Sequence, residues 1–319
     1  MRNIFLFIIL CFVLLSCKKQ DEADKEIASV EVEVSLERFD LIFGNSVPSD
    51  LPDLRLRYPF MFSNQFTDSD YASRMTDTLQ IELRNEVSKT FEEFPEMADI
   101  ESLFQHMKYY FKTFREPRLI ALTSDVDYRN KVIVTDSITL IALDNYLGSD
   151  HRFYDGIQNY LRQNFDRKMI VSDLADSYAK KLIPEPVSRT FLGDMIYHGK
   201  LLYFKDRIIP FADDTIKIGY SREQLEWAMA NESNIWRYFV ENELLFNTDP
   251  KLASRFINPA PFSKFNLELD RESPGRLGEY MGWQIVRSYM DNNDVEFKQL
   301  FNKNAEEIFN NARFKPRKE

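Results

Sequence analysis

A histidine and two carboxylates are the residues of this sequence whose types and spacing come nearest to a metal site. Asp194 and His198 are four residues apart in a segment with helical spacing, so they would share one helix face. Glu232 interrupts the apolar stripe of a later helical segment. Carboxylate and imidazole groups bind divalent metals, and a metal-bound water can attack a substrate. One hypothesis is therefore a metal-dependent hydrolase; the simpler interpretation is a surface Asp194–His198 pair with Glu232 at a hydrated edge.

The other common catalytic motifs are absent from the sequence. It contains no His-Glu-x-x-His, no Gly-x-Ser-x-Gly, no phosphate-binding loop and no Gly-x-Gly-x-x-Gly. The two cysteines, Cys11 and Cys17, both lie near the N-terminus. The rest of the chain therefore has no thiol for a disulfide, a nucleophile or a Cys metal ligand. We expect a protein without a cofactor that acts by contact rather than by catalysis.

Glycines near residue 280 mark a second candidate site. Gly275, Gly278 and Gly282 are three of the nine glycines in the chain, and the last two share one helical face. Each costs about 1 kcal/mol relative to alanine inside a helix, so another backbone or a ligand should approach closely there. Packing against the core is the interpretation we favour, and a helix that binds a glycan or peptide is the alternative. Arg276 and Arg287 could anchor carboxylates, within the fold or on a partner.

The N-terminus has the features of an export signal with a lipid attachment site. A positively charged start precedes an apolar run from Ile4 to Leu15, which is too short to span a bilayer of about 30 Å. Leu14-Leu15-Ser16-Cys17 resembles the lipobox of lipoprotein signal peptides. We predict that residues 1–16 are removed and that acyl chains such as palmitate on Cys17 hold the protein to a membrane.

A charged segment follows the predicted lipid attachment site. Residues 17–29 begin Cys-Lys-Lys-Gln-Asp-Glu and contain few large apolar side chains, which predicts a flexible tether. The formal charge of the whole chain is −10, and loss of Arg2 with the leader brings it to about −11. Because an acidic chain without a basic stripe repels phosphate backbones, nucleic acid is excluded as a partner.

Residues 30–319 are expected to form a single α+β domain. Alternation from Val30 to Leu36 predicts a first strand, and three short β-rich runs follow, with a turn at 127–130 between the first two. Helical spacing surrounds them, and Ser221 and Gln224 form a capping box at the start of the best helix. We expect a small, mostly antiparallel sheet with helices around it. The expected β-rich runs are 118–123, 132–134 and 138–143, the expected helices are 70–94, 100–114, 187–204 and 221–246, and 48–59 should be irregular.

Several long strings of the sequence resemble the GldB family of gliding-motility lipoproteins of Bacteroidetes. Examples are Met195-Ile196-Tyr197-His198-Gly199-Lys200 and the segments 256–262 and 273–278, and the resemblance extends from the lipobox through nearly the whole chain. It implies a cell-envelope lipoprotein that is needed for gliding, a movement linked to type IX secretion. It implies no established catalytic activity. We expect the protein on the periplasmic face of a membrane rather than at the cell surface, with motility or secretion proteins as partners.

The order of a sheet, a helix over 187–204 and a helix over 221–246 also resembles zincin-like peptidases. Where such a peptidase carries His-Glu-x-x-His, this chain has Asp194-Met195-Ile196-Tyr197-His198. Without two histidines and a glutamate, zinc would lack its ligands and its water would lack a base. The resemblance therefore implies at most a peptidase scaffold without peptidase chemistry.

Overall fold

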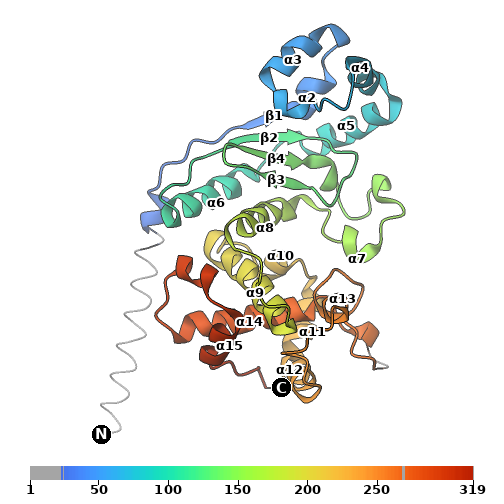
Figure 1. The fold of residues 1–319 in the computed structure, drawn as a ribbon. Helices are drawn as coiled ribbons and strands as arrows, with labels where there is room; N and C mark the ends of the chain where they lie inside the picture. The colour runs from blue at the N-terminus through green and yellow to red at the C-terminus, as the bar shows by residue number, and fades with distance from the viewer. Residues whose placement is uncertain (1–22, 24, 268–269, 319) are drawn as a thin grey trace.

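A computed structural model describes residues 23, 25–267 and 270–318 of the chain. The leader, Cys17 and the first part of the predicted tether lie outside these residues. The described chain forms a small sheet with helices on both faces (Figure 1).

The sheet is mostly parallel. Its strands are β1 (Leu36–Arg38), β2 (Arg118–Leu122), β3 (Val132–Val134) and β4 (Ile138–Ala142), in the order β1-β2-β4-β3. β1 and β2 are parallel, as are β2 and β4, and only β3 runs antiparallel to its neighbour β4. The expectation of a mostly antiparallel sheet is therefore wrong.

Burial on both faces explains the position of β2. Leu119 and Ala121 belong to the large hydrophobic cluster on one side of the sheet, whereas Ile120 belongs to a smaller cluster on the other side. A strand buried on both faces is typical of a parallel sheet covered by helices. β2 therefore lies between β1 and β4, while β3, whose Ile133 is 44% exposed, forms an edge. The segment 127–130 connects β2 to β3 without pairing them.

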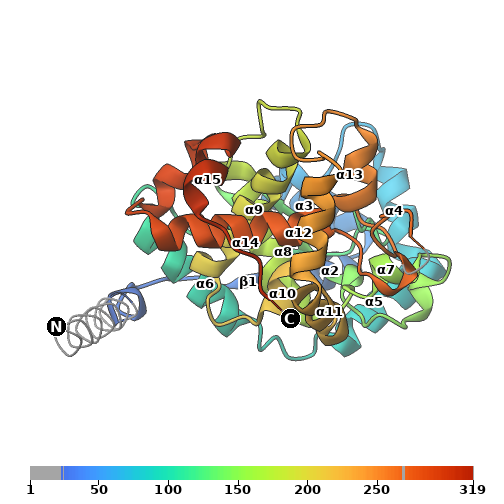
Figure 2. The ribbon, with the colours of Figure 1, turned by 90° about the horizontal axis from the view of Figure 1, so that it is seen from below.

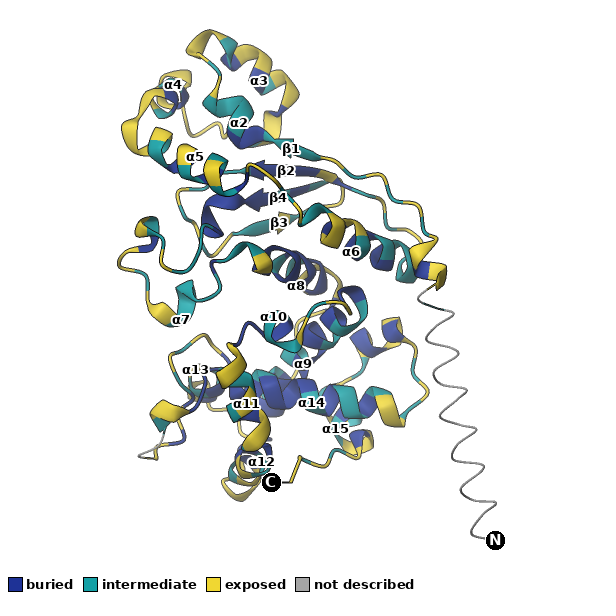
Figure 3. Ribbon diagram, turned by 180° about the vertical axis from the view of Figure 1, so that it is seen from behind, coloured by how far each residue is buried: buried dark blue, intermediate teal, exposed yellow. Residues whose placement is uncertain are grey.

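Helices cover the two faces unequally. α2, α3 and α4 pack around the smaller cluster on one face, while α6 and α8 cover the other and are followed by α9 and α14 (Figure 1). The ribbon coloured by burial shows α8, α9 and α14 as the most buried helices, with α3 and α4 largely exposed (Figure 3). Seen from below, on the side away from the sheet, α12, α14 and α15 lie toward the viewer (Figure 2). The helices are α2 (Phe39–Gly44), α3 (Leu51–Arg57), α4 (Asp68–Thr76), α5 (Thr78–Thr90), α6 (Met97–Tyr110), α7 (Asn159–Arg162), α8 (Ile170–Leu182), α9 (Phe191–Ile208), α10 (Asp214–Ile218), α11 (Arg222–Ala230), α12 (Glu232–Glu241), α13 (Lys251–Phe256), α14 (Leu277–Asn292) and α15 (Ala305–Ala312).

Polar residues break two of the predicted helices. The helix expected over 70–94 is α4 followed by α5, because Asp77 accepts a hydrogen bond from the backbone N–H of Gln80 and begins a new helix. The helix expected from Ser221 is α11 followed by α12, with a break at Asn231. The capping box of Ser221 and Gln224 is confirmed. The segment 48–59, expected to be irregular, contains α3.

The zincin-like layout is not confirmed. α8 packs on β3, and α9, which carries the segment compared with a zinc-binding helix, packs on α8 (Figure 1). Thus α8 separates α9 from the sheet. Nowhere in the described part of the chain is a helix both long enough and apolar enough to cross a membrane.

The end of the predicted tether is folded against α6. Residues 25–28 are helical, and Ile27 is only 4% exposed. The hydroxyl of Tyr109 donates to the carboxylate of Glu26 at 3.1 Å, and Gln105 donates to the carbonyl oxygen of Val30 at 3.2 Å. The folded part of the chain therefore begins ahead of residue 30.

Candidate functional site

The close approach that the glycines predict is a crossing of α9 and α14. A methyl group at Gly282 would collide with the carbonyl oxygen of Met195, and one at Gly199 would collide with the carbonyl oxygen of Gly282. Backbone oxygens cannot move aside as a flexible side chain can. The glycines therefore pack against the chain's own backbone, and they bring the side chains of α9 and α14 together.

The start of α14 holds Arg276 in an uncommon conformation. Its φ of 59° lies in the left-handed region, which costs a residue with a Cβ about 1 kcal/mol. A Cβ on the preceding Gly275 would collide with the carbonyl oxygen of Ala260, and one on Gly278 would lie 2.8 Å from the carbonyl oxygen of Phe256. The segment is therefore held tightly on both sides of the arginine.

Glu279 joins two residues that the sequence analysis assigned to different sites. Its Oε1 lies 3.1 Å from Nδ1 of His198, and its Oε2 accepts a hydrogen bond from Arg276 at 3.2 Å. Arg276 also donates to the carbonyl oxygen of Gly219 at 3.1 Å. Burial alone would raise the pKa of Glu279, but the charges of His198 and Arg276 hold that pKa below its usual value. The carboxylate therefore lies between the guanidinium of Arg276 and the imidazole of His198.

A charged cavity of about 280 Å³ lies beside Glu279, between α8, α9, α10 and the start of α14. Asp176, on α8, pairs with Lys180 at 2.7 Å and with Lys205 at 3.6 Å. Burial would raise the pKa of Asp176, and these lysines lower it well below its usual range. Burial lowers the pKa of Lys205, even though Asp176 opposes the shift. The charged and titratable residues lining the cavity are Lys131, Asp173, Asp176, Lys180, His198, Lys205, Lys217, Arg276 and Glu279.

A second cavity of about 230 Å³ shares part of this lining. Lys131, Asn164, Asp173, Pro259 and Arg276 line both cavities. The second cavity differs in being walled by aromatic and amide side chains: Tyr128, Tyr160, Phe165, Tyr220, Gln163 and Gln224. A charged compartment and an aromatic one therefore lie side by side.

Asp194, His198 and Glu232 do not assemble into a metal site. Burial raises the pKa of Asp194, which lies one turn before His198 on α9. Glu232 is only 2% exposed, and its carboxylate accepts hydrogen bonds from the Tyr280 hydroxyl at 2.8 Å and the Arg317 backbone N–H at 3.0 Å. Among the described residues, no group of three or more His, Cys, Asp or Glu side chains could hold a metal ion. The hydrolase hypothesis gains no support from this arrangement.

Most of the charged residues around the charged cavity were not predicted from the sequence. Asp176, Lys180, Lys205 and Glu279 come from three helices that are distant in the sequence. A signal was present in α9, where Lys205 follows the apolar run Leu-Leu-Tyr-Phe in a segment that the pattern predicts to be buried. A lysine is rarely buried without a carboxylate partner, so its position indicated an ion pair.

Arg287, farther along α14, holds an ion cluster that Lys217 connects to the charged cavity. Its guanidinium donates to both carboxylate oxygens of Asp206 at 2.7 Å and to both of Asp214 at 2.9 Å. It also stacks 3.6 Å from the centre of the Trp283 ring. The carboxylate that the sequence analysis expected for this arginine therefore lies within the fold.

Replacing Arg287 with leucine should lower the free energy of unfolding by about 2–3 kcal/mol, because two partly buried carboxylates lose a guanidinium that donates to both and are left with the ammonium group of Lys217. Urea denaturation measures this change. Arg237→Leu provides the control, since Arg237 is exposed and donates to nearby Asn234 at 3.1 Å, so its loss should stay within about 0.5 kcal/mol. Equal stability of the Arg287 and Arg237 variants would contradict the prediction.

His198 should make the stability of the protein depend on pH above about 6.5. Burial alone would lower its pKa, but the carboxylates of Glu279 and Asp176 outweigh burial and the charge of Lys180, and raise the pKa above 6.5. The stabilisation from protonated His198 is therefore complete below pH 6.5 and disappears as the pH rises through the folded-state pKa. His198→Gln should flatten that decline in chemical denaturation at successive pH values. An unchanged slope in the variant would show that His198 does not cause it.

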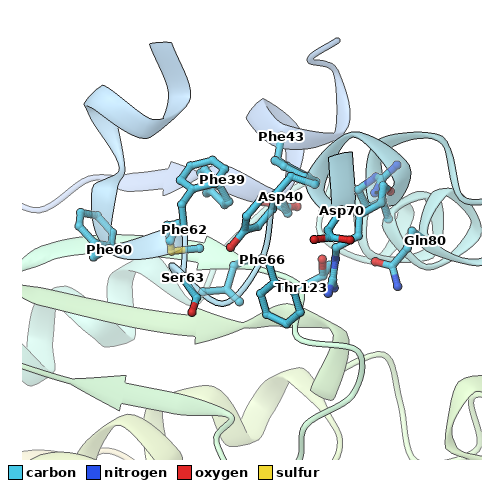
Figure 4. Close-up of a pocket in the computed structure, with 15 residues that line it drawn as sticks. Phe39, Asp40, Phe43, Phe60, Phe62, Ser63, Phe66, Asp70, Gln80 and Thr123 are labelled. Carbon is cyan, nitrogen blue, oxygen red and sulfur yellow. Dashed lines mark hydrogen bonds between the residues drawn. The ribbon is translucent and has the colours of Figure 1, made fainter. Parts of the chain in front are cut away.

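A third cavity, of about 340 Å³, is lined by several phenylalanines beside α2 (Figure 4). Its walls come from α2, α4, α5 and the segment 60–66, above the end of β2. Phe60 and Phe66 line it while remaining 40% and 51% exposed. Arg84 forms part of its polar wall and donates to the carbonyl oxygen of Met75 at 3.0 Å. The lining is Phe39, Asp40, Phe43, Phe60, Met61, Phe62, Ser63, Phe66, Asp70, Tyr71, Arg74, Gln80, Arg84, Leu122 and Thr123.

A comparison with known proteins gives one match. A family model described as gliding motility protein GldB matches residues 20–316. The matched range includes every strand and helix described above and the residues that line all three cavities. No curated protein and no solved structure matches the chain.

Proposed function

We propose that this chain, which belongs to the GldB family of gliding motility proteins, is a lipid-anchored component of the gliding apparatus that acts through protein contacts. Acyl chains on Cys17 hold it to a membrane, with the folded body on the periplasmic side. The proposal includes a link to type IX secretion through the proteins that it contacts. The family match over residues 20–316 is the observation that carries the proposal.

Exposed apolar side chains on α3–α5 support a role in protein contacts. Leu56 is 82% exposed, Leu79 is 57% exposed and Phe66 is 51% exposed. Large apolar side chains that gather on a surface are common where proteins meet. Phe66 lines the third cavity, and the neighbouring helices α3 and α4 are largely exposed (Figure 3).

Deletion of the gene tests the proposed role. Cells without it should lose spreading on agar, and the wild-type gene supplied in trans should restore spreading. Secretion by the type IX pathway, assayed in the same strain, tests the proposed link between this protein and that pathway. Normal spreading of the deletion strain would reject the motility role, and normal secretion with lost spreading would reject only the link to secretion.

A further inference from the structure

We propose that the paired cavities beside Glu279 bind a phosphorylated organic molecule. The phosphate would occupy the charged cavity, and the organic part would occupy the adjoining cavity of about 230 Å³ that Tyr128 and Tyr160 line. The proposal goes beyond the motility role and does not depend on it. Charge, backbone conformation and the adjoining compartment support it independently.

Positive charge exceeds negative charge in the charged cavity. Lys217 is set aside because Asp206 and Asp214, at 3.1 and 3.5 Å, hold its ammonium group. Four cations and His198 then face three carboxylates. The cations are Lys131, Lys180, Lys205 and Arg276, and the carboxylates are Asp173, Asp176 and Glu279. The whole chain has a formal net charge of −10, so a site with an excess of positive charge contrasts with the rest of the protein. Cations gathered in a concave site with low-dielectric walls attract anions.

Four cations share the three carboxylates of the cavity. Lys131 pairs with Asp173. Asp176 lies between Lys180 and Lys205, and Glu279 lies between His198 and Arg276. Asp176 therefore faces two ammonium groups, whereas Glu279 faces the guanidinium of Arg276 and the imidazole of His198. Lys205 also donates to the hydroxyl of Ser172 and the carbonyl oxygen of Lys217, so a phosphate group entering the cavity would share mainly Lys180 and Arg276 with the carboxylates. Arg276 and the lysines are the side chains that proteins commonly use for phosphate.

Arg276 occupies a backbone position where glycine would be less costly. Its φ is 59°, a left-handed backbone conformation that glycine adopts at lower cost than arginine. The strained position turns the guanidinium toward Glu279 and Gly219 at the boundary of the two cavities. Strain of this kind is concentrated at functional sites, where the side chain gained outweighs the conformational penalty.

The aromatic compartment specifies an organic ligand rather than free phosphate. Tyr128 and Tyr160 line it with their rings, and the ring of Tyr220 lies 5.1 Å from the guanidinium of Arg276. Gln163 and Gln224 add amide groups: the side-chain N–H of Gln163 donates to the carbonyl oxygen of Gly219 at 3.2 Å, and Oε1 of Gln224 accepts from the backbone N–H of Ser221 at 2.9 Å. Rings and amides together suit a hydroxylated ring such as a sugar. Its volume of about 230 Å³ exceeds what a bare oxyanion fills. A sugar phosphate therefore represents the ligand class.

Binding is tested on the full mature lipoprotein in a non-ionic detergent at pH 7. Thermal unfolding is followed during titration with inorganic phosphate, glucose 6-phosphate, glucose or glucuronate, with sodium chloride as the ionic-strength control. Glucose 6-phosphate should give a saturable rise in Tm and bind about tenfold more tightly than phosphate, a difference that Kd values from equilibrium dialysis measure directly. Glucuronate tests whether a carboxylate replaces the phosphate group.

Two variants locate the site. Lys180→Gln removes a side chain that is 58% exposed, so the fold should persist, and Arg276→Gln removes the guanidinium at the boundary. Each should weaken glucose 6-phosphate binding at least about tenfold. Lys303→Gln, in the Lys303–Glu307 pair outside the cavity, is the charge-matched control and should leave Kd unchanged.

Three results would overturn the proposal. The first is a response to glucose 6-phosphate no larger than that to sodium chloride. The second is unchanged binding in the folded Lys180→Gln protein. The third is equal stabilisation by glucose and glucose 6-phosphate without any effect of phosphate. Phosphate binding as tight as that of glucose 6-phosphate would reject the organic compartment.

Discussion

Valine in place of Gly282 should prevent the protein from folding. The first added carbon would overlap the carbonyl oxygen of Met195, and the helices α9 and α14 would have to separate along their whole contact. Alanine at the same position should lower the free energy of unfolding by about 3 kcal/mol or more, since overpacking usually costs 1–3 kcal/mol even where only side chains must move. Soluble yield and urea denaturation measure the two effects.

Gln284 provides the matched position on the same helix. It is half-buried and lies two residues from Gly282, so Gln284→Ala should change the unfolding free energy by less than about 1 kcal/mol. If Gly282→Ala were as stable as Gln284→Ala, the two helices could not be in the close contact described here.

Serine in place of Cys17 should block maturation and abolish spreading. The lipid is transferred to a sulfur atom, and a serine oxygen does not replace it in lipobox processing. The variant should accumulate with its leader uncleaved and without the mass of the acyl chains, as intact-protein mass spectrometry of cell fractions would show. Membrane retention alone is not the readout, because an uncleaved leader also holds a protein at a membrane.

Cys11 offers the control within the same leader. Cys11→Ser should leave processing, acylation and spreading unchanged, because Cys11 is removed with residues 1–16. A Cys17→Ser protein that is cleaved and acylated normally would remove the anchor from the proposed function.

Local signals in the sequence predicted single elements well. Ser221 and Gln224 lie three residues apart, and their reciprocal bonds to the backbone form wherever a helix begins there. The glycines of α14 predicted a close backbone approach. Glycine destabilises a helix, so it is expected inside one where a larger side chain would not fit. Both predictions depend on a few neighbouring residues and their immediate surroundings.

Contacts between distant segments could not be predicted in the same way. The apolar run of β2 is compatible with an antiparallel or a parallel neighbour, and its pairing with β4 depends on helices covering both of its faces. Asp194 was chosen as a partner for His198 because it is one turn away on the same helix. The ion-pair partner in the structure is Glu279 from α14, which only the crossing at Gly199 and Gly282 brings near.

The contact between Glu26 and Tyr109 limits how far the folded body can stand from the bilayer. Residues 18–24 separate Cys17, the proposed lipid attachment site, from the segment that is docked on α6, and a fully extended chain of that length reaches roughly 30 Å. In the proposed lipoprotein, the end of α6 that carries Tyr109 would therefore stay within about that distance of the lipid headgroups. A partner that contacts this end of the folded body would meet it close to the membrane surface. Inserting a long Gly-Ser spacer after Lys18 would remove that restriction without touching a single folded residue.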